Sequence, residues 1–292
     1  MNYLKVILAI LLLTSCQTTG LKIGNVDVGK LVNQGVKVWD ASMIDETQES
    51  QLGENISAVL LGVRPLHQNV EVNQYVNHVG RWLAQNSTRP ELPWHFGVID
   101  SDAINAFAAP GGYVFITSGM LMQLNSEAEL AAVLAHEISH VTLAHHLNAL
   151  KSGALRGAVT EALFVSADAY QANTGADREQ RQYAAWAKTV TSAAQDLYSK
   201  GLDRTDEMKA DERGLRLMAR AGYDPYAYIS SLQVIEAISP DDSSLALLYK
   251  THPTATERIT HIQQTLVEVQ HVKGKTLIKR FQQTLSGQRN SS

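Results

Sequence analysis

The chain is almost without cysteine, since Cys16 is the only one among its 292 residues. A single cysteine excludes an intrachain disulfide and every metal site built from several thiolates. Any transition metal must therefore be held by histidine, aspartate or glutamate. The chain also lacks a basic excess, because 29 acidic residues outnumber 25 lysine and arginine residues. Nucleic-acid-binding proteins normally carry a surplus of positive charge, so we expect no nucleic acid as a partner.

Long hydrophobic runs are also missing, because no apolar stretch reaches the roughly 20 residues that a membrane-spanning helix needs. The longest run, residues 6–13, follows Lys5 and has the length of a signal-peptide core. It ends in the sequence LTSC, which resembles the lipobox of bacterial lipoproteins. The resemblance implies cleavage before Cys16 and lipidation of that cysteine. The alternative is an ordinary signal peptide with an incidental cysteine.

These features predict a protein of the bacterial envelope that faces the periplasm and is attached to the membrane by a lipid anchor at Cys16. The next residue is Gln17 and not aspartate, which by analogy with enteric sorting favours the outer membrane. We expect a signal peptide (1–15), the lipidated cysteine with a tether or helix (16–44), a folded domain (45–285) and a disordered tail (286–292). Hydrophobic residues make up 45% of the chain and charged residues 18%, which is ordinary for a folded domain.

Helical periodicity dominates the folded part of the sequence. The expected helices lie within residues 30–62, 70–85, from 126 onwards, 150–200, about 203–221 and after 253. Short β-rich runs lie at residues 94–100, 104–108 and 113–117, with a Pro-Gly-Gly turn before the last of them. The pattern predicts a predominantly helical α+β protein with a small mixed β-sheet between helices.

An H-E-x-x-H sequence, His136 to His140, lies inside the helix that Ser126 and Glu129 begin as a predicted capping box. Positions i and i+4 of a helix lie about 40° apart, so both imidazoles can bind one Zn²⁺. Glu137 lies about 100° round the helix, within reach of a metal-bound water. That is the geometry of a general base acting on a metal-activated nucleophile. The alternative is a helix whose histidines only pack or cap.

Two further histidines follow on the same stretch of sequence. If the helix continues straight, His145 lies about 180° from His136 and His146 about 80° from it. Neither could then join the same metal, and we expect them to pack or to support the ligands. The remaining histidines, apart from His252, have no cluster of metal-binding residues around them in the sequence.

A catalytic zinc takes three protein ligands and keeps one position for water, so a third ligand is needed. Glu207 is the best candidate, because it lies one helical turn from Asp211 on a single helix face. One carboxylate could bind the metal while the other accepts an N–H hydrogen bond from a ligating imidazole. Taken alone, such an acidic pair is more often a solvated helix face.

The H-E-x-x-H helix, the later sequence E-x-x-A-D at 207–211 and the His252-Pro253 pair together resemble a zinc metallopeptidase family. This family includes HtpX, the mitochondrial Oma-type protease and the CAAX prenyl proteases, and the chain most resembles its soluble periplasmic members. The matching stretches are residues 105–145, 204–225 and 251–259. We expect no helical-repeat domain of the kind that some periplasmic members carry after the peptidase domain.

The resemblance implies a zincin-like core with an H-E-x-x-H active-site helix and one Zn²⁺ per chain. It assigns His136, His140 and Glu207 as zinc ligands and Glu137 as the catalytic base. It also implies that Asp211 hydrogen-bonds a ligating histidine. It places His252 near the zinc, where this histidine could stabilise the oxyanion or block the metal.

The resemblance further implies an edge strand along which an extended substrate could add as another strand. The residues of this strand are Asn105, Ala106, Phe107 and Ala108.

By resemblance, we expect a zinc-dependent endopeptidase that cleaves misfolded or unassembled envelope proteins. Two alternatives remain open from the sequence. One is a chaperone or assembly factor for outer-membrane proteins that keeps the zinc site but rarely cleaves. The other is a scaffold whose zinc is only structural, which would require four protein ligands around the metal.

Overall fold

The computed structural model describes residues 22–23, 26–27, 44–152, 201–239 and 241–289. The predicted signal peptide, the lipidation site Cys16, most of the tether and nearly all of the Ala-rich span 150–200 lie outside these residues. Contacts divide the chain into two units, Met1–Met43 and Ile44–Ser292. In the first unit, strands β1 (Lys22–Ile23) and β2 (Val26–Asp27) pair antiparallel.

A three-stranded mixed sheet forms the β part of the second unit. Its strands are β3 (His95–Ile99), β4 (Ala106–Ala109) and β5 (Tyr113–Thr117), in the order β3-β5-β4. Strand β5 pairs parallel with β3 and antiparallel with β4, so β4 is the last strand in this order. The 3-10 turn η2 (Pro110–Gly112) joins β4 to β5, and both of its glycines have positive φ. The three predicted strands and the small mixed sheet are confirmed.

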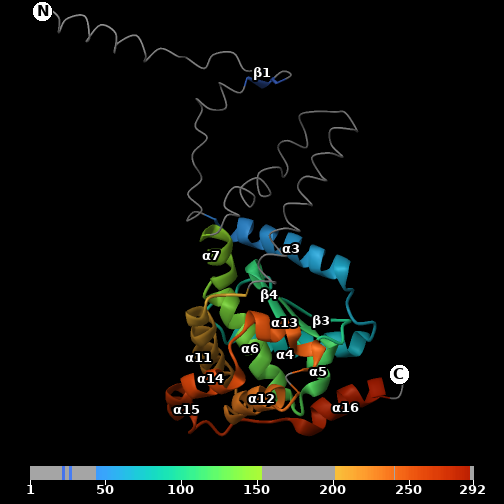
Figure 1. Ribbon diagram of the computed structural model, residues 1–292, viewed down its shortest axis with the longest axis vertical. Helices are drawn as coiled ribbons and strands as arrows, with labels where there is room; N and C mark the ends of the chain where they lie inside the picture. Colours follow the sequence, from blue (N-terminus) through green and yellow to red (C-terminus); the bar gives the residue numbers. More distant parts are fainter. Residues whose placement is uncertain (1–21, 24–25, 28–43, 153–200, 240, 290–292) are drawn as a thin grey trace, which may run out of the picture. The chain divides into compact units, whose positions relative to one another are not determined.

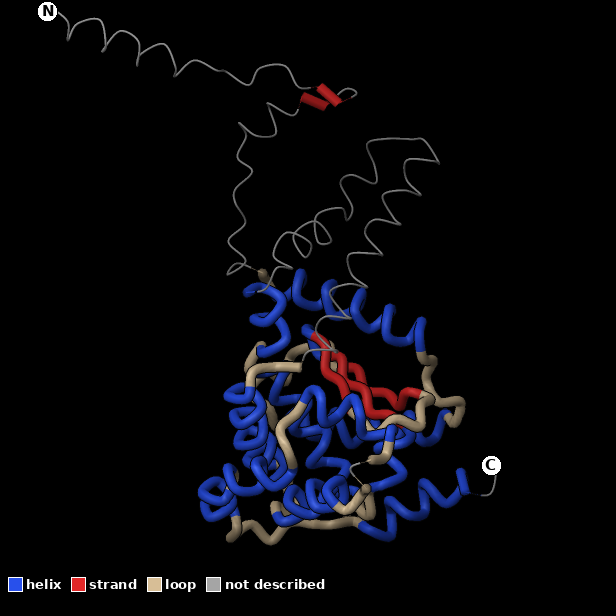
Figure 2. Tube along the Cα trace, in the orientation of Figure 1, coloured by secondary structure: helices blue, strands red, loops and turns tan. Residues whose placement is uncertain are grey.

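Helices make up most of the rest (Figures 1 and 2). They are α3 (Glu46–Val63), α4 (Val70–Gln85), α5 (Ser118–Gln123), α6 (Glu127–Thr142), α7 (His145–Ser152), α11 (Arg204–Arg220), α12 (Tyr226–Glu236), α13 (Ala246–Thr251), α14 (Ala255–His261), α15 (Gln263–Val269) and α16 (Ile278–Arg289), with the 3-10 turn η3 (Ser243–Leu245). Figure 2 shows the strands between α3 and the other helices. Contacts of α3 with η2, of α4 with β3 and of α6 with β4 fix this arrangement. The predicted fold class, predominantly helical α+β, is confirmed.

Helix α6 carries the H-E-x-x-H sequence and is buried along nearly its whole length. The Ser126 hydroxyl accepts a hydrogen bond from the Glu129 N–H at 3.1 Å, as the sequence predicts. The second half of the predicted capping box is wrong, because the Glu129 carboxylate accepts instead from the Asn125 N–H at 2.6 Å. The helix ends at Thr142, and Ala144 then adopts a left-handed φ of 55°.

Helix α11 packs along α6 and brings a distant part of the sequence to the H-E-x-x-H residues. Gly214 allows this close approach, because a Cβ there would lie 3.1 Å from the His136 backbone nitrogen. Helix α11 ends at Arg220 and is followed by Gly222 with a φ of 86°, as its sequence predicts. The predicted capping box of Thr254 and Glu257 is present at the start of α14.

Several elements have no counterpart among the predicted ones. Helices α5, α12, α13, α15 and α16 are short, and their apolar spacing is not clear enough to identify them from the sequence. We expected a disordered tail from residue 286, but helix α16 continues to Arg289. The predicted first helix starts at Glu46 in the described residues, where Asp45 forms an N-terminal capping box with Gln48.

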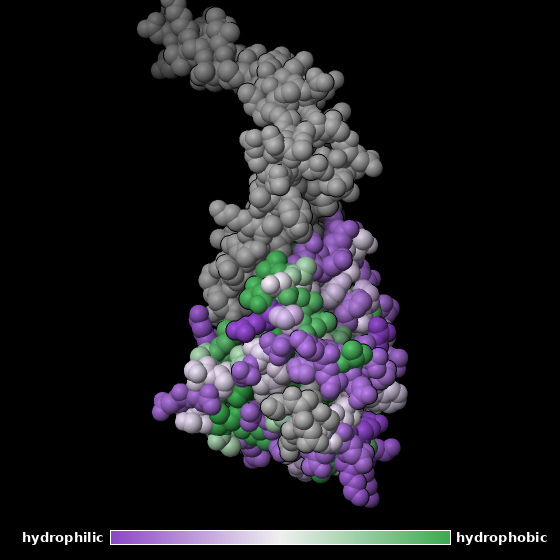
Figure 3. All heavy atoms as spheres, turned by 90° about the vertical axis from the view of Figure 1, so that its right-hand side faces the viewer, coloured by the Kyte–Doolittle hydropathy of each residue, from purple (hydrophilic) through white to green (hydrophobic). Residues whose placement is uncertain are grey.

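The described residues include no helix with both the length and the apolar character needed to cross a membrane. On the face of the molecule seen in Figure 3, hydrophilic side chains are interrupted by groups of hydrophobic ones. Among the described residues, the buried apolar side chains form two clusters. The larger joins the sheet to α4, α6, α11 and α12, and the smaller lies beneath α3 and α7.

Candidate metal centre

Three buried side chains that the sequence marked as metal ligands meet between α6 and α11. The Nε2 atoms of His136 and His140 lie 3.0 Å apart. The carboxylate oxygens of Glu207 lie 3.5 Å from His136 Nε2 and 3.4 Å from His140 Nε2. All three residues are almost fully buried, with exposed fractions of 4%, 1% and 1%. The helical spacing of α6 and the packing of α11 thus bring the three predicted ligands together.

The outer nitrogen of each histidine lies beside a group that can accept a hydrogen bond from it. His136 Nδ1 lies 2.9 Å from the Asp211 carboxylate, and His140 Nδ1 lies 3.0 Å from His145 Nδ1. With a proton on each Nδ1, both Nε2 atoms present a lone pair to the space beside Glu207. In that tautomeric state two lone pairs and a carboxylate converge in a buried space, which is unfavourable unless a cation lies between them.

The donor distances fit a single metal ion. Zinc bound tetrahedrally at about 2.0–2.2 Å separates its donors from one another by about 3.3–3.6 Å. The separations of 3.0, 3.4 and 3.5 Å are close to this range. In addition, Glu207 Oε2 is buried and has no hydrogen-bond partner among the described residues. The site therefore has the size, the chemistry and a spare carboxylate oxygen to hold a metal.

His252 lies beside the three candidate ligands as a possible fourth. Its Nε2 is 3.6 Å from Glu207 Oε2, and its ring centroid is 5.6 Å from that of His136. One donor atom from each of the four residues lies within 4.8 Å of the others. His252 terminates α13, and its Nδ1 lies 2.9 Å from the Thr251 hydroxyl. The end of α13 therefore places a fourth candidate ligand beside the other three.

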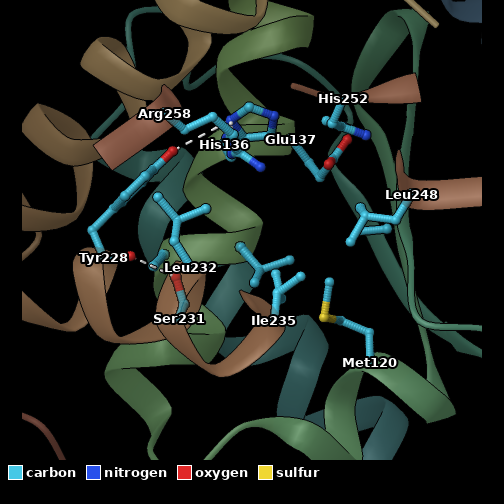
Figure 4. A pocket seen from close by; sticks show the side chains of 13 residues that line it. Met120, His136, Glu137, Tyr228, Ser231, Leu232, Ile235, Leu248, His252 and Arg258 are labelled. Atoms are coloured by element: carbon cyan, nitrogen blue, oxygen red, sulfur yellow. Dashed lines mark hydrogen bonds between the residues drawn. The ribbon is translucent and has the colours of Figure 1, made fainter. Parts of the chain in front are cut away.

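Glu137 is buried next to the candidate metal site. Together with His252 it lines the pocket drawn in Figure 4. Burial raises the pKa of Glu137 to about 7, well above that of a carboxyl group in water. A carboxylate whose pKa lies near neutrality is suited to accept a proton and then to return it.

A second layer of contacts holds His136. The Asp211 carboxylate faces its Nδ1 and is itself bound by Arg258 through Nε at 3.0 Å and Nη2 at 2.6 Å. The Tyr228 hydroxyl donates a further hydrogen bond to Asp211 at 2.9 Å. Burial alone would raise the pKa of Asp211, but the Arg258 guanidinium and His136 hold it below its usual range. The carboxylate is thus kept charged and oriented towards the imidazole.

Tyr228 and Arg258 are functional candidates that the sequence analysis missed. Arg258 lies in the stretch 251–259, one residue after Glu257 of the predicted capping box. Tyr228 lies in α12, which the sequence pattern did not predict. No local pattern in the sequence signals the pairing of Arg258 with Asp211, because the two residues lie 47 positions apart.

The expectation that His145 lies on the far side of the helix from the metal ligands is wrong. It assumed a straight helix, but α6 ends at Thr142 and the turn at Ala144 redirects the chain. As a result, the rings of both His145 and His146 lie 5.2 Å, centroid to centroid, from that of His140. Neither belongs to the group of four that could hold the metal.

Two hollows adjoin the site. One is largely apolar and lies between His136, Glu137 and helix α12 (Figure 4). Its apolar walls include Met120, Val133, Leu232, Ile235 and Leu248. The other contains the predicted edge-strand residues Asn105, Ala106, Phe107 and Ala108, together with Glu137, His140, Glu207 and His252. Of the four edge residues, Asn105 precedes β4 and the other three belong to it.

Residues 71–266 match peptidase family M48, and the chain belongs to this family. The matching stretch contains the four-residue cluster, Glu137, Asp211 and Arg258. The resemblance inferred from the motifs is therefore confirmed at the level of the family.

Three relatives illustrate the similarity. The chain is 31% identical to the beta-barrel assembly-enhancing protease of Escherichia coli strain K12 over 218 residues, which are 73% of this chain and 42% of that protein. It is 30% identical to the mitochondrial metalloendopeptidase OMA1 of Schizosaccharomyces pombe, over 69% of this chain and 55% of that protein. It is 24% identical to the metalloprotease YcaL of E. coli K12, over 87% of this chain and 92% of that protein. The chain spans less than half the length of the beta-barrel assembly-enhancing proteases that it matches.

Proposed function

We propose that the protein is a zinc-dependent metalloendopeptidase of the bacterial envelope. One observation carries this proposal. The buried Nε2 atoms of two imidazoles and the Glu207 carboxylate lie close together beside Glu137. Membership of a peptidase family and the metalloprotease names of its relatives support the same chemistry.

His136, His140 and Glu207 would hold the zinc ion, as in peptidases with an H-E-x-x-H motif and a downstream glutamate ligand. Bound zinc supplies a Lewis acid that polarises the scissile carbonyl and lowers the pKa of water. Glu137 accepts the proton of the attacking water and later donates it to the leaving amine nitrogen. Asp211, held by Arg258, keeps His136 in the tautomer whose Nε2 can bind metal.

The substrate would lie as an extended segment along β4. Support comes from the hollow that the residues of β4 share with Glu137 and Glu207. The apolar hollow beside His136 favours an apolar side chain next to the cleaved bond. Such a site suits unfolded segments, because they expose apolar side chains in extended conformation.

Misfolded or unassembled envelope proteins are the substrates that we propose. The LTSC sequence before residue 17 supports a periplasm-facing lipoprotein anchored at Cys16 in the outer membrane. The name of the beta-barrel assembly-enhancing proteases agrees with a role near assembling outer-membrane proteins. In this proposal, the lipid anchor brings the peptidase to the membrane at which its substrates assemble.

Metal removal tests the proposed activity. We expect the purified protein to contain about one zinc per chain and to hydrolyse casein, and a chelator to abolish the hydrolysis. Added zinc should restore the hydrolysis, because the proposed ligands are held by helices α6 and α11.

Mass spectrometry of the casein fragments should show apolar residues next to the cleaved bonds. Hydrolysis that is unaffected by complete metal removal would refute the proposal.

His252 is proposed to occupy the fourth metal position in the resting protein and to leave it when substrate binds. Support comes from its Nε2, which lies 3.6 Å from Glu207 Oε2. We therefore expect His252→Ala to hydrolyse casein faster than the unchanged protein in initial-rate assays. Low activity without activation would contradict such gating, and a large loss would favour a role in stabilising the oxyanion.

An assembly factor with little proteolysis is the second candidate. The four converging donors favour it, because a zinc bound by four protein ligands has no position for water. The same closure would favour a purely structural zinc. Complementation separates these roles from a peptidase: a Glu137→Gln chain would still support assembly in cells if cleavage were dispensable.

A further inference from the structure

The turn after α6 places His145 against a metal-ligand candidate that a continuous helix would keep out of reach. Five positions along a straight helix rotate a side chain by about 140°, so His145 would face away from His140. Instead, Ala144 adopts a φ of 55°, a left-handed conformation that residues other than glycine seldom adopt. Strained backbone of this kind often marks a functional constraint. Here the left-handed residue turns the chain so that His145 contacts His140.

His145 makes two contacts that complement each other. Its Nδ1 lies 3.0 Å from His140 Nδ1, and the two rings meet edge to face with an interplanar angle of 69°. On the other side, its Nε2 lies 3.6 Å from an Asp206 carboxylate oxygen. His145 is 5% exposed, so water has little access to compete for these contacts.

The contacts define one consistent set of protons. His140 must leave Nε2 unprotonated to bind metal, so its proton is on Nδ1 and needs an acceptor. His145 Nδ1 is that acceptor only if the His145 proton is on Nε2, which is the nitrogen facing Asp206. Asp206 immediately precedes Glu207 on α11, so one helix supplies both a metal ligand and this outer carboxylate.

We propose that His145 is a positioning residue for the metal: it accepts the Nδ1 proton of His140 and thereby fixes the tautomer and orientation of that ligand. This inference rests on the proposed metal site. The two imidazole ligands are then held differently, His136 by the Asp211 carboxylate and His140 by a neutral imidazole. A carboxylate partner increases ligand basicity more than a neutral one does, so the two ligands are not equivalent.

Replacing His145 by leucine and by asparagine tests the proposal. Leucine removes the acceptor, whereas asparagine places an amide oxygen close to the position of Nδ1. Zinc affinity is measured by competition with a chromophoric chelator on metal-free full-length protein. We expect His145→Leu to bind zinc about 10–100-fold more weakly and His145→Asn to bind within a few fold of the unchanged protein. The visible spectrum of the cobalt-substituted protein should change in His145→Leu and not in His145→Asn.

Variants at Ala144 provide a second, independent measurement. Glycine accepts the left-handed φ, whereas a β-branched valine opposes it, so Ala144→Gly should keep zinc affinity and Ala144→Val should lower it. Thermal unfolding of each metal-free variant shows whether the fold is intact. Unchanged affinity and cobalt spectrum in His145→Leu would overturn the positioning role while leaving the metal site standing. If the unchanged protein binds no zinc, the proposed function itself fails.

Discussion

Replacing Glu137 with glutamine should abolish peptide hydrolysis while leaving the metal bound. The substitution keeps the size of the side chain but removes the carboxylate that accepts a proton from water. General-base catalysis contributes about 10²–10⁴-fold to a rate, so casein hydrolysis should fall by at least this factor. The proposed ligands His136, His140 and Glu207 are unchanged in this variant, and metal analysis should still find one ion per chain.

The same substitution at Glu129 is the matched control. Glu129 lies on the same helix, and its carboxylate accepts a hydrogen bond from the Asn125 N–H at 2.6 Å. A glutamine amide oxygen can still accept that bond, so Glu129→Gln should cleave casein at nearly the unchanged rate. Substantial hydrolysis by Glu137→Gln would show that another group is the base.

Replacing Glu207 with alanine should have the largest effect on metal binding. The change removes one of the three proposed ligands and leaves the two buried imidazoles without their anionic partner. Loss of an outer hydrogen-bonding partner costs 10–100-fold in metal affinity, and loss of a direct ligand should exceed about 100-fold. Zinc affinity is read by chelator competition, and hydrolysis should disappear at limiting zinc.

Glu212→Ala is the matched control for this variant on the same helix α11. The Glu212 side chain is partly exposed and pairs with Arg216 at 3.3 Å and His261 at 2.9 Å. Exposed ion pairs contribute about 0–1 kcal/mol, so neither the fold nor the zinc affinity should change noticeably. Unchanged metal stoichiometry and affinity in Glu207→Ala would identify a different carboxylate as the ligand.

The parts of the site that follow local periodicity could be predicted from the sequence. His136 and His140 share a face because they are one helical turn apart, and the helix begins at Ser126 as its sequence indicates. Glu207 was a weaker inference, because an acidic pair says nothing about which other helix it meets. The family motifs supplied that link, and the packing of α11 on α6 provides the contact.

The parts that depend on a break in periodicity or on distant packing could not be predicted. The position of His145 follows from one left-handed residue, Ala144, and no glycine marks that turn in the sequence. Arg258 and Tyr228 meet Asp211 only because α12 and α14 pack together beside α11. Their partners lie 47 and 17 residues away in the sequence, and no local pattern records such pairs.

Anomalous diffraction from crystals of the zinc-loaded protein would show whether the three proposed ligands bind one ion. Data collected on both sides of the zinc absorption edge locate the ion without reference to activity. We expect one strong peak per chain, about 2.0–2.2 Å from His136 Nε2, His140 Nε2 and a Glu207 carboxylate oxygen. A peak bound by other residues, or none beside these three at saturating zinc, would contradict this expectation.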